Sequence, residues 1–307
     1  MSDMFDILQA PFIQNALLAG SLIAVVAAIV GYFLIVRGLT FTGHALPNIG
    51  FAGAAGAVML GIDPVFGLFA FTIGAGIGIA LLGKEVRERD ISIGILMTFA
   101  LGLGLLFLSL YSGYAERVYS ILFGTILGIS QEDVLITALM SLLVLASLFV
   151  LFRPLLFSSL DPDVAQARGV PVRLLAVLFL VLVAITISMS VQVVGALLVF
   201  TLLIGPAATA IRIFHRPLWA IACSVLLGLG YTWLGITLAA LQGYWPVSFF
   251  IATISFAVYL PVRLLSPLWL GKGTRNYVGR TAKVSSSVAP IAAIRENVGE
   301  MQEASRP

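Results

Sequence analysis

The chain has 307 residues, of which 60% are hydrophobic and 10% are charged, and its formal net charge is +3. A soluble domain carries about a quarter charged residues, so this chain lacks the polar surface that water requires. Its single cysteine, Cys223, excludes an internal disulfide and a cysteine zinc cluster. The basic residues are scattered through short loops rather than gathered in a patch, so no nucleic-acid partner is expected. Composition therefore indicates a membrane protein in contact with lipid.

Apolar runs between the charged residues predict the helices. Most runs are about 17–25 residues long, the length at which a helix crosses roughly 30 Å of hydrocarbon. The run 174–211 is too long for one crossing, and Gln192 and Gly195 near its middle divide it in two. None of the runs alternates like a barrel strand, so the predicted fold is all-α, a polytopic transmembrane helical bundle of eight to nine helices. The runs are 12–36, 42–60, 64–83, 91–112, 134–152, the two parts of 174–211, 218–241 and 246–262.

The charges of the loops predict the orientation. One set of loops is basic and the alternating set is mostly acidic, and basic loops remain in the cytoplasm. We therefore expect a multi-pass protein of the cytoplasmic (inner) membrane with its N-terminus outside and its C-terminus inside. The basic set holds Arg37, Lys84, Arg87, Arg89, Arg153, Arg168, Arg173, Arg212, Arg216, Arg263 and Lys272, and the opposite set holds Asp3, Asp6, Asp63, Glu132 and Asp133 beside Arg117.

Composition also divides the chain into two regions. Residues 1–270 form the predicted transmembrane domain, and residues 271–307 are rich in Ser, Ala and charged side chains, which predicts a mostly disordered cytoplasmic tail. Small residues recur inside the apolar runs and predict close helix packing, because they let backbones approach in lipid. These are Gly50, Gly53 and Gly56, and the pair Gly74 and Gly78.

One polar pair interrupts the second apolar run. His44 and Asn48 are four residues apart and therefore share a helix face. Polar side chains inside a bilayer are costly and usually face a cavity or a partner. An imidazole nitrogen suits zinc, manganese or iron, and an amide oxygen is a weak, hard ligand. The pair is a candidate metal site, and the alternative is a capping or interhelical hydrogen-bond pair.

Three further segments bear on function. The stretch 78–85 looks like a phosphate-binding loop, but Glu85 stands where the loop needs Ser or Thr, so we expect no ATP site in this chain.

The stretch 161–169 is predicted to be a polar connection, with Asp161 or Asp163 as the helix cap and Gly169 at the end of the helix. In 191–216 the Gly205–Pro206 pair is expected to end one helix, with 207–214 forming a short second one that suits docking to a soluble partner.

These segments together resemble the permease subunit of the ABC-type zinc and manganese importer family. Residues 195–210 are similar to the family's VGxLLVxALLxxPAATA pattern, and 161–169 to its acid-to-glycine pattern. The resemblance extends to about residue 268 and implies a fold related to that of cobalamin and siderophore ABC importer permeases. It implies that the chain is not an enzyme, binds no cofactor stably and passes a divalent metal ion, which is its cargo.

The resemblance also implies the partners and the sites. These partners are a separate ABC ATPase subunit, an extracytoplasmic metal-binding protein and a second permease copy in a homodimer, within membrane lipid. Family members carry G-D-x-x-x-H where this chain has His44 at the Asp position and Asn48 at the His position, so these two are the implied transient metal ligands. The ATPase docking residues implied are Gly205, Pro206, Arg212, His215 and Arg216.

Two other functions remain as alternatives. A stand-alone proton-coupled secondary transporter would usually carry Asp, Glu or Lys at its helix centres, where this sequence has none. A membrane scaffold or enzyme subunit is the other alternative, although no Ser-His-Asp set or HExxH motif is present. The resemblance favours an ATP-driven importer of zinc, manganese or iron that works by alternating access.

Overall fold

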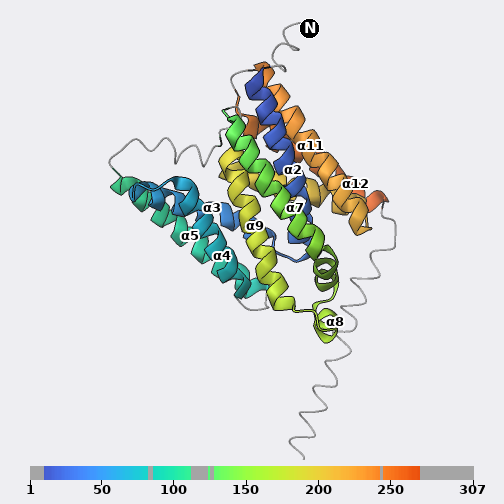
Figure 1. Cartoon of the computed structure of the whole chain (residues 1–307). Coiled ribbons are helices and arrows are strands. Elements are labelled where there is room, and N and C mark those ends of the chain that lie inside the picture. Colours follow the sequence, from blue (N-terminus) through green and yellow to red (C-terminus); the bar gives the residue numbers. More distant parts are fainter. Residues whose placement is uncertain (1–9, 82–85, 112–123, 125–127, 243–244, 270–307) are drawn as a thin grey trace, which may run out of the picture. The chain divides into compact units, whose positions relative to one another are not determined.

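The computed structural model describes residues 10–81, 86–111, 124, 128–242 and 245–269, and every element in this part of the chain is a helix (Figure 1). The compact helical unit ends at Leu260, and 261–269 are the end of the last helix. The predicted tail, 271–307, lies outside the described residues, as do Lys84 and Arg117. The helices are α2 (Pro11–Val36), α3 (Thr40–Met59), α4 (Pro64–Leu81), α5 (Val86–Leu110), α7 (Gln131–Leu160), α8 (Pro162–Ala167), α9 (Val172–Val194), α10 (Ala196–Ile213), α11 (Pro217–Gln242) and α12 (Val247–Trp269).

Seven described helices are long and apolar enough to cross a membrane: α2, α4, α5, α7, α9, α11 and α12. Helix α10 adds a shorter apolar stretch, Leu198–Ile213. Helix α3 is 20 residues long, but His44, Pro47 and Asn48 interrupt its apolar sequence. The predicted helical bundle is confirmed, and its predicted segments match the nine long helices of the described chain. The helix that carries the candidate metal ligands is therefore also the most polar of the predicted crossings.

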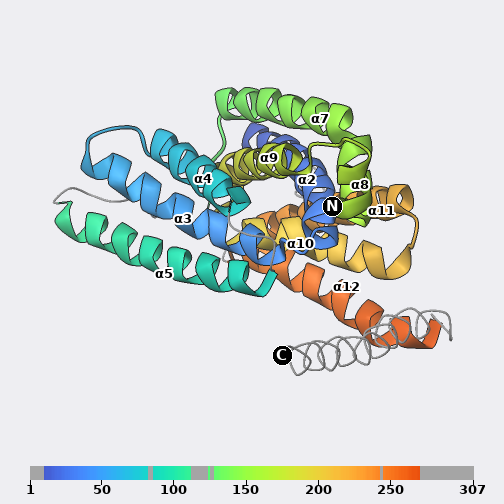
Figure 2. The same cartoon turned by 90° about the horizontal axis from the view of Figure 1, so that it is seen from below.

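Helices α2 and α9 lie at the centre of the helical unit. Two thirds of the apolar stretch of each is buried, against a third or less in the other spans. Helix α2 packs against α7, α9, α10 and α11, and α9 packs against α4 and α7. Helix α3 lies between α4 and α5 (Figure 2) and also contacts α10. The outer faces of the remaining spans carry exposed apolar side chains, as lipid contact requires.

Aromatic contacts and one arginine join α2 to α7 and α9. The ring of Phe33 on α2 meets Phe152 of α7 and Phe179 of α9 edge-on, with centroids 5.8 and 6.2 Å apart. Arg37, which ends α2, lies over the Phe179 ring at 5.4 Å and donates to Ser158 Oγ at 3.2 Å. Burial lowers the pKa of the Arg37 guanidinium to about 10, so it stays charged at neutral pH. This cation fixes the end of α2 against two neighbouring helices.

Glycines set the spacing of several helix pairs. The predicted close packing is present at Gly50 and Gly53 of α3. Gly53 of α3 and Gly67 of α4 face each other so closely that a Cβ on either would overlap the other's carbonyl oxygen. A Cβ at Gly50 would overlap Leu68 and Thr72 of α4. Gly74 and Gly78 face open space within this chain, so for them close helix packing stays a prediction. The sequence spacing is the same in both cases, and only the neighbouring helix distinguishes them.

The predicted helix end at Gly205–Pro206 was wrong. Helix α10 continues through Pro206 to Ile213. Proline removes one backbone bond, but ending the helix in hydrocarbon would leave several backbone groups unbonded. Thr209 Oγ1 donates to the Gly205 carbonyl at 2.9 Å and supports the same turn. The break lies instead at Gly195, where a positive φ of 88° separates α9 from α10.

The contact between α2 and α10 yields a stability prediction. A Cβ at Gly31 of α2 would overlap the backbone carbonyl of Leu203 in α10, whereas Gly74 of α4 faces open space. We expect Gly31→Ala to destabilise the protein by about 1–3 kcal/mol through overpacking. Its melting temperature in detergent should fall, and that of the matched variant Gly74→Ala should not. Equal melting temperatures for the two variants would contradict the close α2–α10 contact.

Candidate metal-transport site

His44 lies in the second turn of α3. Arg37, Gly38 and Leu39 form the turn from α2, where Gly38 has a positive φ of 64°, and α3 then begins at Thr40. The imidazole is exposed within the single chain. Its ring meets the Phe200 ring of α10 edge-on at 5.1 Å and lies 6.5 Å from Phe41. Two aromatic rings therefore orient an imidazole that remains exposed.

Asn48 lies one turn further along α3, on the same face. Its Nδ2 donates to the His44 carbonyl oxygen at 2.9 Å and contacts Met97 Sδ of α5 at 3.7 Å. The predicted shared face is therefore present, and part of the hydrogen-bonding alternative is present as well. Both contacts use the amide nitrogen, so the amide oxygen is the atom with ligand chemistry.

A cavity of about 540 Å³ opens beside His44, and its lining includes an acid that sequence reasoning missed. Asp90 lies in the first turns of α5. Because helix α4 lies between it and His44 in the sequence, only packing of α3 against α5 brings them to one cavity. An acid at the end of the charged run 84–90 is indistinguishable from a loop charge, so no sequence signal singled it out. The lining residues are Gly38, Thr40, Phe41, His44, Asp90 and Phe200.

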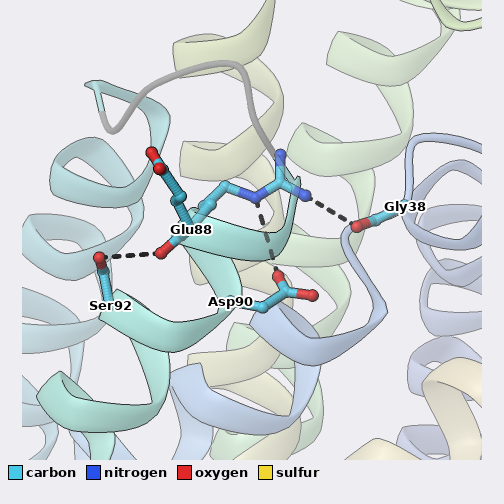
Figure 3. A network of polar contacts seen from close by, with 5 residues as sticks. Gly38, Glu88, Asp90 and Ser92 are labelled. Carbon is cyan, nitrogen blue, oxygen red and sulfur yellow. Dashed lines mark hydrogen bonds and ion pairs between the residues drawn. The ribbon is translucent and has the colours of Figure 1, made fainter.

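A polar network holds the rim of this cavity (Figure 3). Arg89 Nη2 donates to the Gly38 carbonyl oxygen at 2.8 Å, and Arg89 Nε lies 3.9 Å from Asp90 Oδ1. Ser92 Oγ donates to the Glu88 carbonyl oxygen at 3.0 Å within α5. The arginine therefore ties the start of α5 to the turn between α2 and α3, which keeps Asp90 at the cavity that His44 also lines.

A second cavity, of about 670 Å³, lies where the starts of α4 and α7 meet the end of α9. Its two carboxylates already cap helices. Asp63 Oδ1 accepts from the Val65 amide at 2.9 Å, and Asp133 Oδ2 accepts from the Ser130 amide and hydroxyl. Among the described residues, no three His, Cys, Asp or Glu side chains are grouped as a metal set. His44 and Asp90 remain as the imidazole and carboxylate that line one cavity.

The predicted docking residues fall into two groups. Pro206 is buried within α10, and Gly205 is packed against the Ser255 side chain of α12. Arg212, His215 and Arg216 are exposed at the end of α10 and the turn to α11. The Arg212 guanidinium lies over the Tyr259 ring at 5.7 Å. Phe214 and Trp219 stack at 6.5 Å beside them and are exposed too. The exposed residues form a surface that is both cationic and aromatic.

The structure has the features of a multi-pass membrane transport protein. Its long helices carry apolar outer faces, and α3 is polar and bears an exposed imidazole. Residues 9–266 match the ABC 3 transport family, and the chain belongs to that family. The family resemblance seen in the sequence is thereby confirmed.

Two relatives illustrate how far the similarity extends. The manganese transport system membrane protein MntC of Halalkalibacterium halodurans is 29% identical over 93% of this chain and 98% of the relative. The manganese import system permease protein ScaB of Streptococcus parasanguinis is 35% identical over 69% of this chain and 75% of the relative.

Solved structures show the same arrangement of helices. One chain of PsaBC from Streptococcus pneumoniae, determined in complex with Fab, has a TM-score of 0.76 and 29% identity, and the match covers 87% of this chain and 96% of that one. A transporter described as metal-chelate ABC type, in an inward-facing conformation, has a TM-score of 0.65 at 20% identity, over 83% of this chain and 89% of that one. The second likeness concerns the fold alone.

Proposed function

We propose that this chain is the permease subunit of an ATP-driven importer of a divalent transition metal, with manganese as the first candidate and zinc and iron as the others. The observation that carries the proposal is the accessible His44 face of α3 beside the cavity that Asp90 also lines. The names of the relatives support manganese, because both matched proteins are named as manganese transport or import components.

His44 and Asn48 act as transient ligands in this proposal. A neutral imidazole and an amide oxygen bind a dication weakly, which suits a carrier that must release its cargo. The ion passes between two copies of the chain, and ATP binding and hydrolysis in a separate subunit move the helices so that the path opens to one side at a time. An extracytoplasmic metal-binding protein delivers the ion. The N-terminus lies outside and the C-terminus in the cytoplasm.

The ATPase docks on the exposed surface formed by Arg212, Phe214, His215, Arg216 and Trp219. This surface lies on the basic, cytoplasmic side of the proposed topology. Gly205 and Pro206 contribute indirectly, because their packing holds the end of α10 in place. Cationic side chains beside stacked aromatic rings offer both charge and apolar area to a soluble partner.

A proton-coupled carrier is the weaker alternative. Such a carrier needs an ionisable side chain in the membrane to relay the proton. In the described helices, every Asp and Glu lies in the first turns: Glu88, Asp90, Glu132, Asp133 and Asp163. This distribution favours an external source of energy.

Replacement of His44 tests the proposed path. In the complex with its ATPase and binding protein, we expect His44→Ala to lower ATP-driven uptake of Mn²⁺ by about 10–100-fold, the usual cost of losing a group that supports metal binding. Radioactive Mn²⁺ uptake in vesicles measures the change, and co-purification of the ATPase shows that the complex is intact. Thr237→Ala, a polar change on the exposed face of α11, is the control and should import normally. Wild-type uptake by His44→Ala would remove His44 from the path.

Charge reversal tests the docking surface. We expect Arg212→Glu or Arg216→Glu to reduce co-purification of the ATPase several-fold, because reversing an exposed interface charge removes the electrostatic complementarity that favours the partner. Arg173→Glu makes the same change at an exposed position of α9 on the proposed cytoplasmic side and serves as the control. If Arg173→Glu and Arg212→Glu lose the ATPase equally, the effect is general charge repulsion and the surface is wrongly placed.

A further inference from the structure

We infer that α5 supplies half of the cation path: Asp90 and Met97 of α5, with His44 and Asn48 of α3, form a track of transient ligands along the contact between the two helices. This inference rests on the proposed function and assigns α5 a part in it. We call these four residues the α3–α5 track.

The two helices run side by side in the same direction. Gly94 of α5 lies where a Cβ would contact the Phe41 ring of α3 at 3.7 Å, and Gly104 lies against Phe51 in the same way at 3.1 Å. Rising positions on α3 therefore meet rising positions on α5. Because the helices are parallel, groups at successive levels form an ordered series from the turn before α3 toward its far end.

Two staggered levels of this series carry ligand chemistry. The first level is the cavity that His44 and Asp90 line together, with Asp90 nearer the turn before α3. At the second level the Asn48 amide contacts Met97 Sδ at 3.7 Å. His44 and Asn48 are one turn apart on α3, and Asp90 and Met97 are two turns apart on α5, so each pair lies on one helix face.

The carboxylate answers a deficit of charge. An imidazole and an amide are neutral, and a dication that leaves water needs a negative partner. Among the described residues that line the cavity, Asp90 is the one with a formal negative charge. Its Oδ1 is buried and makes no hydrogen bond, although Arg89 Nε lies 3.9 Å away. Figure 3 shows the second carboxylate oxygen directed away from that guanidinium.

Arg89 and Met97 set how strongly the track holds an ion. The guanidinium is bound to the Gly38 carbonyl oxygen, so it stays near Asp90 without occupying both oxygens. A nearby cation weakens the hold of the carboxylate on a metal ion and favours release. Thioether sulfur is a soft ligand that transition metals accept more readily than Mg²⁺ or Ca²⁺, although Mn²⁺ also favours oxygen ligands. The second level therefore discriminates against the abundant hard cations.

The first test measures uptake. In the complete complex, Asp90→Asn should import Mn²⁺ about tenfold more slowly than wild type, within the range that loss of a supporting carboxylate costs. Asp90→Glu, which keeps the charge, should restore part of the rate. Glu88→Gln removes one charge from an exposed position of the same helix and should import at the wild-type rate. Co-purification of the ATPase shows that each complex is assembled.

The second test reports occupancy without transport. In a Cys223→Ser background, Met97→Cys should react with a water-soluble thiol reagent, and Mn²⁺ should slow that reaction while equal Mg²⁺ should not. Met59→Cys, at the far end of α3, is the matched control, and Mn²⁺ should leave its reaction rate unchanged. Absence of modification at Met97→Cys, or modification that Mn²⁺ does not slow, would place Met97 outside the path and overturn its part in the track.

The outcomes separate the inference from the proposed function. If the wild-type complex accumulates no Mn²⁺ with ATP, the proposed function fails for manganese and the track fails with it. If the wild type imports Mn²⁺ and Asp90→Asn imports at the same rate, the track loses its carboxylate and the proposed function stands. Slow import by both Asp90→Asn and Glu88→Gln would show a general charge effect and would also overturn the role of Asp90.

Discussion

In hydrocarbon, every backbone amide and carbonyl has to be hydrogen-bonded within the protein, and most of this structure follows from that constraint. Helices continue where the sequence would break them in water, as α10 does through Pro206. Hydroxyl side chains bond to carbonyls of their own helix, as Thr186 Oγ1 does to Leu182 and Ser190 Oγ to Thr186. Helix α3 follows the same rule at Asn48, whose Nδ2 donates to the His44 carbonyl oxygen, while the His44 side chain stays exposed.

In the proposed function, packing turns this polar helix into a site. Helices α4 and α5 flank α3 through glycine contacts, and Phe200 of α10 adds a ring against His44. These neighbours leave one face of α3 accessible and place two α5 side chains beside it. Each contribution is weak alone: a neutral imidazole, an amide oxygen, a carboxylate near a guanidinium and a thioether. Weak ligands in series suit an ion that has to move on, because tight binding at any level would trap it.

Features that depend on neighbouring residues in the sequence could be predicted, and features that depend on contacts between distant helices could not. Helix limits are local, since charges mark the ends of apolar runs, and the predicted limits agree with α2, α4 and α11 to within a few residues. Cavity partners are not local, and Asp90 was missed because only the α3–α5 contact brings it to His44. Glycine spacing alone could not separate Gly53, which meets Gly67, from Gly74, which meets nothing in this chain. Pro206 was misread because the rule for water was applied in lipid.

Helix α10 connects the two regions on which the proposed function depends. Phe200, near its start, contacts the His44 ring, and Arg212, near its end, belongs to the exposed docking surface. Between them the helix is unbroken and is held by the close approach of Leu203 to Gly31 and of Gly205 to Ser255. A rigid helix held near its middle transmits displacement, so movement of the docked end shifts Phe200 against His44. A break at Gly205–Pro206 would have uncoupled these ends, so in the proposed function the continuity of α10 lets movement of a docked ATPase reach the His44 face of α3.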